Sequence, residues 1–335
     1  MECKQLGCTG MQVSELCLGT MTFGRETDKN ISQQIISRFL DAGGDFIDTA
    51  DIYGNPRGDS EKIVGEALKG KRDNVILATK AYFPTGDGPN ARGLSRIHLI
   101  QAIENSLRRL QTDYVDLFYV HCWDGLTPLE ETLSTLDLLV KQGKIRYVGA
   151  SNFTAWQMMK ALETSRRCSW EQFICFQIQY NLLTRGVERE IIPLCREEKV
   201  GITAWAPLAG GFLSGKYRRG SVAKEGRLVQ IKKENLDSWQ NRATEENFCI
   251  LDVIDEIARG KDKSCAQVAL AWVKCQPGVT APIIGARTLD QFEDNLDVFN
   301  MEFTSQELKS LDEASRLEDE YPYSFIRGSS RYYPY

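Results

Sequence analysis

Short apolar or β-branched runs, each followed by a longer segment of helical periodicity, recur eight times along the chain. This alternation predicts a parallel sheet with right-handed crossover connections. Eight such units favour a closed (β/α)8 TIM barrel of the α/β class over an open doubly wound sheet. The sequence has no G-x-G-x-x-G fingerprint, which also weighs against a Rossmann fold. The predicted strands span residues 15–20, 45–50, 75–80, 114–121, 145–151, 173–178, 201–207 and 279–285.

The segments between these runs carry helix signals. Residues 30–43 begin at Asn30 as a candidate N-cap and end at a glycine, and residues 94–110 carry a candidate cap at Ser95. Pro128 and Gly143 mark the first turn and the stop of another helix, and a further helix is predicted within residues 188–199. One apolar face is expected on the helix capped by Ser95, made of Ile97, Ile100, Ile103, Leu107 and Leu110.

Two irregular regions interrupt this alternation. Residues 208–244 form a long polar insertion after the seventh strand, and a loop of that length at the catalytic rim of a barrel is usually functional or disordered. Residues 318–335 form an aromatic tail that is too short to be a domain. Because no change of composition marks a linker, residues 1–335 are expected to form a single barrel domain.

The composition is typical of a globular protein, with 42% apolar and 26% charged residues. A net charge of −5 without a long run of either sign argues against nucleic acid or an acidic membrane surface as the main partner. No apolar run is long enough to cross a bilayer, and the first residues contain no signal segment. Ten scattered cysteines without C-x-x-C spacing and only two histidines predict no metal site and favour the cytoplasm, where thiols stay reduced.

Polar side chains occupy the ends of three consecutive predicted strands. Asp48 ends the second strand, Lys80 the third and His121 the fourth, while Tyr53 lies in the loop after the second. In a barrel the chemistry takes place at the carboxyl ends of the strands. Neighbouring strands are roughly 5 Å apart. The four side chains are therefore expected to converge, although each one alone would more often be structural.

These residue types suit the protonation of an oxygen that is becoming an alkoxide. A lysine beside an aspartate stays charged, and a charged ammonium beside a phenol favours the phenolate. A free tyrosine, with a pKa of about 10, is a poor acid near neutrality. A lysine neighbour would bring Tyr53 closer to the working range, and His121 can bind the same substrate oxygen or relay a proton.

The motifs "DTADIYG", "GKIRYVGASN" and "ITAWAPLAGG", with the strands that end in Lys80 and His121, resemble the aldo-keto reductases. The resemblance runs in consistent order from about residue 5 to 315 and is closest in kind to the branch that holds bacterial-type enzymes and potassium channel β subunits. It implies a barrel that binds NADPH and reduces an aldehyde or ketone to an alcohol by hydride transfer. The tetrad would then be Asp48, Tyr53, Lys80 and His121, with Tyr53 as the general acid.

The same resemblance implies a set of cofactor contacts. Ser151, Asn152 and Gln177 would hold the nicotinamide carboxamide, and Trp205 takes the place of an aromatic residue, commonly tyrosine, that stacks on the nicotinamide. Arg287 is suited to the 2′-phosphate. Further contacts are implied for Gly19, Thr20 and Met21 after the first strand, for Ala206 beside Trp205, for Leu208, Gly210, Leu213, Gly215 and Lys216 in the pyrophosphate loop, and for Gly285, Gln291, Asp294 and Asn295 at the adenosine end, where Asp294 replaces the usual glutamate.

The substrate is expected to be a small carbonyl compound in an apolar, aromatic pocket lined by Phe23 and Trp123, with Met21 nearby. Two alternatives stay open. One is an NADPH-binding regulatory module that resembles potassium channel β subunits, which can carry an extra segment ahead of the barrel, whereas here the first strand is expected near residue 15. The other is a reductase of nucleotide-linked sugars, which no motif separates.

Overall fold

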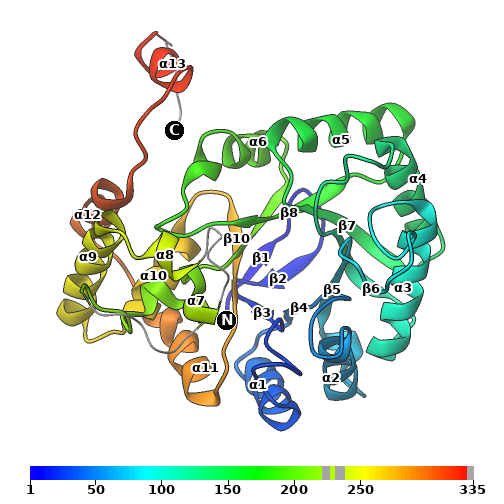
Figure 1. Cartoon of the computed structure of the whole chain (residues 1–335), viewed down its shortest axis with the longest axis horizontal. Coiled ribbons are helices and arrows are strands. Elements are labelled where there is room, and N and C mark those ends of the chain that lie inside the picture. Colours follow the sequence, from blue (N-terminus) through cyan, green and yellow to red (C-terminus); the bar gives the residue numbers. More distant parts are fainter. Residues whose placement is uncertain (221–226, 231–237, 330–335) are drawn as a thin grey trace. The chain divides into compact units, whose positions relative to one another are not determined.

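The computed structural model describes residues 1–220, 227–230 and 238–329. Within these residues, eight strands close into a barrel in the order β10-β3-β4-β5-β6-β7-β8-β9, which confirms the predicted fold class (Figure 1). Neighbouring strands from β10 round to β8 pair in parallel. The barrel strands are β3 (Cys17–Gly19), β4 (Phe46–Asp48), β5 (Ile76–Ala81), β6 (Val115–Val120), β7 (Ile145–Ser151), β8 (Phe173–Gln179), β9 (Gly201–Trp205) and β10 (Val279–Ile284).

Helices follow the strands along the chain, and in Figure 1 the helices α1 to α5 lie outside the strands. The α-helices are α1 (Lys29–Asp41), α2 (Asp59–Ala67), α3 (Arg96–Leu110), α4 (Leu129–Lys141), α5 (Ala155–Cys168), α6 (Ile191–Glu197), α7 (Arg227–Gln230), α8 (Trp239–Arg242), α9 (Glu245–Lys261), α10 (Cys265–Cys275), α11 (Leu289–Leu296), α12 (Ser305–Ser315) and α13 (Tyr323–Ser329). Short 3-10 helices span Arg72–Asn74, Gly186–Glu188, Ala209–Ser214 and Asp297–Asn300. No helix in the described ranges is long and apolar enough to span a membrane.

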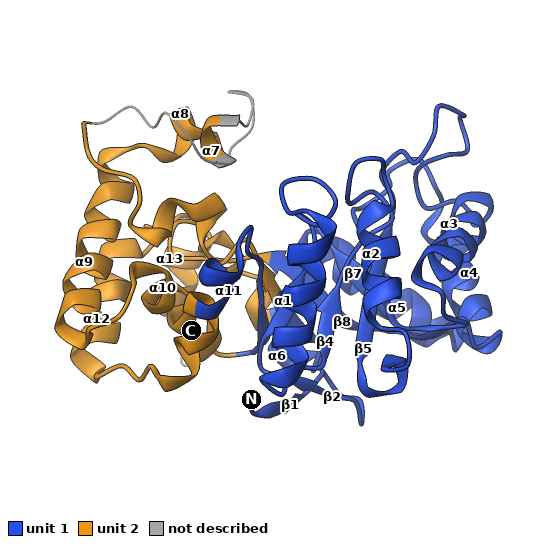
Figure 2. Cartoon of the chain, turned by 90° about the horizontal axis from the view of Figure 1, so that it is seen from below, with its two compact units in different colours: residues 1–178, 194–203, 278–293 blue, residues 179–193, 204–277, 294–335 orange. Residues whose placement is uncertain are grey.

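The chain divides into two compact units, coloured separately in Figure 2. Unit 1 comprises residues 1–178, 194–203 and 278–293, and unit 2 comprises residues 179–193, 204–277 and 294–335. Unit 1 contains β3 to β7, β10 and the helices α1 to α5, so it holds most of the barrel.

An antiparallel hairpin that the sequence patterns do not indicate precedes the barrel. Its strands are β1 (Cys3–Gln5) and β2 (Gln12–Ser14). The Ser14 hydroxyl accepts hydrogen bonds from the backbone N–H groups of Asp45 and Phe46, where β4 begins. A Cβ atom on Gly7 would lie 2.5 Å from the carbonyl oxygen of Ile174 and 3.1 Å from the nitrogen of Gly201, in β8 and β9. The hairpin therefore covers the end of the barrel at which the strands start.

Two details of the predicted helices are wrong. Asp28, not Asn30, caps α1, because its Oδ1 accepts hydrogen bonds from the backbone N–H groups of Asn30 and Ile31 at 2.8 and 3.0 Å. Ile97 does not belong to the buried face of α3, since it is 61% exposed. Six residues of α-helix separate it from Ile103 and place it about 120° around the axis from that residue. The buried face instead contains Leu99, Ile103, Leu107 and Leu110.

The two irregular regions are described only in part. Residues 208–244 contain the 3-10 helix Ala209–Ser214 and the short helices α7 and α8, while 221–226 and 231–237 lie outside the described residues. The tail contains α13, and its last residues, 330–335, also lie outside the described part.

Candidate active site

The buried centre of the candidate site is an ion pair between two strand ends. Lys80 in β5 is 0% exposed, and its Nζ donates hydrogen bonds to Asp48 Oδ2 at 2.5 Å and to the Thr49 carbonyl oxygen at 2.7 Å. Because β4 pairs in parallel with β5, Asp48 and Lys80 lie at the same end of the barrel. Removing either member would leave an uncompensated buried charge, which is strongly unfavourable.

A hydrogen-bond network extends from this pair across the barrel. Gln177 in β8 donates from Nε2 to the second carboxylate oxygen of Asp48, Oδ1, at 2.9 Å. Ser151 in β7 donates from Oγ to the Gln177 carbonyl oxygen at 2.9 Å, and Asn152 donates from Nδ2 to Ser151 Oγ and to the His121 carbonyl oxygen. Both oxygens of Asp48 are thus held, so the ion pair has one fixed orientation.

The charged nitrogen of Lys80 lies beside the ring of Tyr53. Its Nζ lies 5.0 Å from the ring centroid of Tyr53, within the range of a cation–π contact. The Tyr53 and His121 rings are 6.0 Å apart between centroids and cross at 80°. The structure therefore brings the four predicted residues together within unit 1, as the strand-end pattern predicts.

The pKa values of two of these groups are shifted in opposite senses. Burial alone lowers the pKa of Lys80, but the charge of Asp48, the nearby Tyr53 and the hydrogen bond to Asp48 outweigh it and raise this pKa above its usual value. Burial, followed by the charge of Lys80, lowers the pKa of His121 well below its usual range. Near pH 7 the site consequently holds a cationic lysine and a neutral imidazole.

Phe83 is a neighbour of His121 that sequence reasoning missed. Its ring lies 4.8 Å from the His121 ring, at 79°, and Tyr82 lies 5.2 Å from Phe83, at 85°. Both residues are partly exposed. They follow β5 directly, as Trp123 follows β6, so their position just beyond a strand end was the signal available in the sequence.

Asp51 is a second residue that sequence reasoning missed. It lies between Asp48 and Tyr53, is 1% exposed, and neither carboxylate oxygen has a hydrogen-bond partner in the described part of the chain. Burial, then the charge of Glu61, raises the pKa of Asp51 well above its usual value, against the opposing charges of Arg109 and Lys80. Burial of this carboxyl group therefore favours its protonated form.

The predicted cofactor residues of unit 1 lie in several environments. Thr20 donates to the Asp48 carbonyl oxygen from both its backbone nitrogen and its hydroxyl. Gln291 accepts a hydrogen bond from the Arg287 backbone N–H at 3.1 Å, and Arg287 Nη2 is buried without a hydrogen-bond partner among the described residues. Gly285 is exposed, Met21 is partly exposed, and a side chain on Gly19 would collide with Ile283.

The predicted cofactor residues of unit 2 form a glycine-rich turn and a separate polar cluster. Gly210 and Gly215 have φ angles of +66° and +76°, which favour glycine. Trp205 ends β9, and its indole Nε1 is buried without a partner among the described residues. Asp294 accepts hydrogen bonds from Ser264 and Gln267. Of the others, Leu213 and Asn295 are buried, Ala206 and Leu208 are partly exposed, and Lys216 is exposed.

The two predicted substrate residues differ in exposure. Trp123 is partly exposed and makes edge-to-face contacts with Phe153 at 5.1 Å and Trp156 at 5.8 Å. Phe23 is 0% exposed, so it packs inside the protein and presents no free face. Their roles in substrate binding stay predictions.

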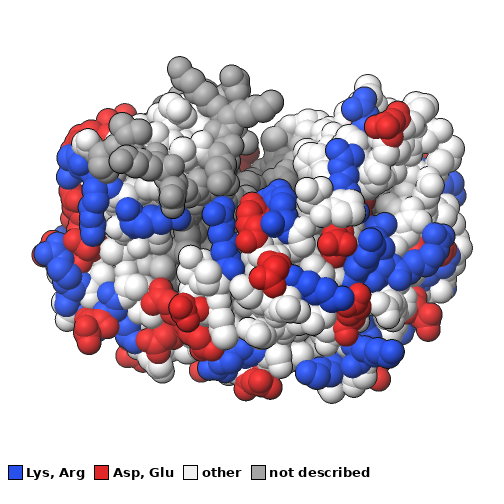
Figure 3. Space-filling view, turned by 60° about the horizontal axis from the view of Figure 1, so that its bottom comes forward, with Lys and Arg blue, Asp and Glu red and all other residues white. Residues whose placement is uncertain are grey.

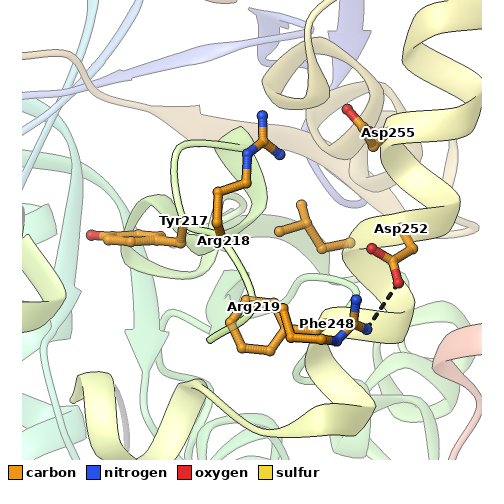
Figure 4. Close-up of a pocket in the computed structure, with 7 residues that line it drawn as sticks. Tyr217, Arg218, Arg219, Phe248, Asp252 and Asp255 are labelled. Carbon is orange, nitrogen blue, oxygen red and sulfur yellow. Dashed lines mark hydrogen bonds and ion pairs between the residues drawn. The ribbon is translucent and has the colours of Figure 1, made fainter. Parts of the chain in front are cut away.

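Unit 2 contains a cavity of about 260 Å³ (Figure 4). The residues that line it are distant in the sequence from the four tetrad residues. Arg219 donates a hydrogen bond to Asp252 at 2.9 Å, drawn as a dashed line in that figure. Two arginines and two aspartates line the cavity, so opposite charges balance there. Charges of both signs are also interspersed over the face of the molecule drawn in Figure 3. The cavity is lined by Tyr217, Arg218, Arg219, Phe248, Leu251, Asp252 and Asp255.

Comparison with known proteins identifies the class to which this barrel belongs. The model of the aldo/keto reductase family matches residues 15–316. An uncharacterized oxidoreductase of Bacillus subtilis is 37% identical over 326 residues, covering 93% of this chain and 95% of that protein. The chain therefore belongs to the aldo/keto reductase family of oxidoreductases.

Two further relatives differ in the roles that their names describe. A probable voltage-gated potassium channel subunit beta of Oryza sativa subsp. japonica is 34% identical over 307 residues, 90% of this chain and 92% of that protein. Versiconal hemiacetal acetate reductase of Aspergillus parasiticus is 33% identical over 344 residues, 93% of this chain and 96% of that protein. Two relatives that are similarly identical to this chain are thus named as a channel subunit and as a reductase.

Proposed function

We propose that this protein is an NADPH-dependent reductase that converts an aldehyde or ketone to an alcohol, with Tyr53 as the proton donor. The observation that carries the proposal is the buried Lys80–Asp48 pair, with Lys80 Nζ 5.0 Å from the Tyr53 ring centroid. An exposed ion pair would have only a weak electrostatic effect, because water screens its charges. A buried cation facing a phenol makes the phenolate more favourable and so prepares the hydroxyl to release its proton.

His121 and Asp48 have supporting roles in this proposal. A neutral imidazole can donate a hydrogen bond to the carbonyl oxygen without adding a second positive charge beside Lys80. Asp48 balances the positive charge of the Lys80 ammonium and holds it in place. Gln177 fixes the same carboxylate through a hydrogen bond. Together these groups favour negative charge on the carbonyl oxygen in the transition state.

Several of the predicted cofactor residues have features that suit NADPH. In unit 1 the buried Nη2 of Arg287, which has no hydrogen-bond partner among the described residues, is a donor that a 2′-phosphate can satisfy. Ser151, Asn152 and Gln177 carry hydroxyl and amide groups suited to a carboxamide. In unit 2, Gly210 and Gly215 have positive φ angles, a backbone conformation found in anion-binding turns and therefore suited to a pyrophosphate. When bound, reduced NADPH would supply the hydride.

The second candidate function is an NADPH-binding regulatory module. It is favoured by the 34% identity to a probable potassium channel subunit beta. Such a module would bind NADPH without sustained consumption of it. Steady-state turnover of NADPH with a panel of aldehydes and ketones separates the two functions, and turnover with nucleotide-linked sugars in the same panel tests the remaining alternative.

The sharpest test of the proposed chemistry is Tyr53→Phe, which removes only the hydroxyl. We expect turnover to fall by about 10²–10⁴-fold, the usual contribution of a general acid, while NADPH binding is retained. Tyr147→Phe, which removes a hydroxyl from a partly exposed position in β7, is the matched control and should keep wild-type turnover. If folded, NADPH-saturated Tyr53→Phe keeps more than about a tenth of the wild-type rate, the proton donor is another group.

We also propose that the protein is located in the cytoplasm. All ten cysteines lie in the described residues and are free thiols, which suits the cytoplasm as the location. The prediction of one barrel domain over residues 1–335 likewise stays a prediction.

A further inference from the structure

The ring of Phe83 is placed next to the proposed oxygen-binding residues. The His121 ring contacts both the Tyr53 ring, at 6.0 Å and 80°, and the Phe83 ring, at 4.8 Å and 79°. A carbonyl oxygen that reaches both Tyr53 and His121 brings the substituent on its carbon close to the His121 ring, which Phe83 also contacts.

Hydrogen bonds hold the backbone on both sides of Phe83. Gly93 donates from its backbone nitrogen to the Tyr82 carbonyl oxygen at 2.8 Å. Arg57, in the loop that carries Tyr53, donates from its guanidinium to the Pro84 carbonyl oxygen. The two loops are thus tied together, and the partly exposed Phe83 ring is presented at a defined position.

We propose that Phe83 is a specificity-determining residue that selects carbonyl compounds whose carbonyl carbon bears an aromatic ring. This inference rests on the proposed function and names the substrate class. Aromatic rings prefer edge-to-face or offset stacking with centroids about 4.5–7 Å apart, the range in which Phe83 already contacts His121. A flat aryl group gains this interaction, whereas a saturated ring of the same size gains only contact area.

The test compares benzaldehyde with cyclohexanecarbaldehyde, which have the same carbon skeleton. The wild-type protein should show a kcat/KM for benzaldehyde about two- to tenfold higher, beyond their difference in intrinsic reactivity, the size of one aromatic pair contact. Phe83→Leu, which keeps an apolar side chain without a ring, should remove this preference and leave kcat/KM for cyclohexanecarbaldehyde within about twofold. Phe83→Tyr, which keeps the ring, should preserve the preference.

Trp156→Ala is the matched control. Trp156 is 59% exposed, and its ring contacts Trp123, whereas Phe83 contacts His121. Removal of the Trp156 ring should therefore leave the preference for benzaldehyde unchanged. The inference is overturned if Phe83→Leu lowers kcat/KM equally for both aldehydes, because Phe83 would then only position His121. It is also overturned if Trp156→Ala abolishes the preference while Phe83→Leu preserves it.

A binding measurement separates this inference from the proposed function. Benzamide and cyclohexanecarboxamide carry the same two rings on an unreactive amide, and calorimetry with and without NADP⁺ gives their affinities. We expect tighter binding of benzamide in the wild type and loss of the difference in Phe83→Leu. Wild-type protein that turns over no carbonyl compound would contradict the proposed function, whereas equal amide binding in wild type would overturn only the role of Phe83.

Discussion

At the scale of single residues, burial and neighbouring charges together set the protonation states of the candidate site. Lys80 stays cationic because Asp48 and Tyr53 outweigh the cost of burial, and His121 stays neutral because burial and the charge of Lys80 both disfavour its protonated form. Arg287 and Asp51 show two further consequences of burying polar groups. Each leads to a prediction that does not depend on the identity of the substrate.

Arg287→Ala should weaken NADPH binding and leave NADH binding unchanged. A guanidinium bound to a phosphate contributes about 1.5–3 kcal/mol. This corresponds to a loss of roughly tenfold or more in NADPH affinity. Dissociation constants for both nucleotides, measured by fluorescence titration, check this expectation, with NADH as the internal control. Equal losses for the two nucleotides would mean that Arg287 does not contact the 2′-phosphate.

Asp51→Asn should change how stability depends on pH. Asp51 ionises near pH 4 in an unfolded chain, but its pKa is raised well above that in the folded protein. Between these two pKa values unfolding releases a proton, so rising pH lowers the stability of the wild type across this window. Urea titrations from pH 5 to 9 should show a smaller fall in Asp51→Asn. Parallel curves for the two proteins would show that Asp51 is already ionised when folded.

At the scale of helices and strands, close approach between elements is the main constraint. Gly65 in α2 lies against α3, where a Cβ atom would meet the carbonyl oxygen of Leu110 at 2.5 Å. Gly260 in α9 is the opposite case, because a Cβ atom there meets no atom of the described residues within 4 Å. Two glycines in helices thus differ only in what surrounds them.

Gly65→Ala and Gly260→Ala should therefore have effects of opposite sign. Alanine favours a helix by about 0.5–1 kcal/mol over glycine, so Gly260→Ala should raise the free energy of unfolding by up to that amount. Gly65→Ala should lower it by about 1–3 kcal/mol or more, since the colliding atoms belong to the backbone. Denaturant unfolding of both variants gives the answer. A stabilising Gly65→Ala would mean that α2 and α3 can move apart at little cost.

Prediction from the sequence succeeds for elements set by local pattern and fails for those set by tertiary contacts. The barrel strands carry continuous apolar runs and place Asp48, Lys80 and His121 at corresponding ends. The β1–β2 hairpin was missed because Cys3–Gln5 is short and mostly exposed, without an apolar pattern. Phe83 was missed because its contact with His121 joins two loops that are distant in sequence.

At the scale of the whole molecule, the hairpin closes the end of the barrel opposite the candidate site. Leu6, between its two strands, is 0% exposed, and its Cδ1 lies 2.6 Å from where a Cβ atom on Gly201 would be. The candidate site instead lies where β4, β5 and β6 end. Stability and chemistry are therefore separated along the barrel axis within unit 1, as is usual for this fold.

Leu6→Ala should destabilise the protein without changing its kinetics. Loss of a fully buried leucine usually costs about 2–5 kcal/mol. The midpoint of urea unfolding should fall accordingly, whereas KM for NADPH and for the carbonyl substrate should match the wild type at a temperature where both proteins are folded. A changed KM in folded Leu6→Ala would show that the two ends of the barrel are coupled.

The hairpin also gives the molecule a usable orientation. The turn between β1 and β2 carries the exposed Cys8 and the exposed Gly10, and a Cβ atom on Gly10 would meet no atom of the described part of the chain within 4 Å. A solid support or a fluorescent label joined to this turn would be attached at the closed end of the barrel. The mouth that holds Tyr53 and His121 would then face the surrounding solution, so immobilised protein should retain free access for small molecules.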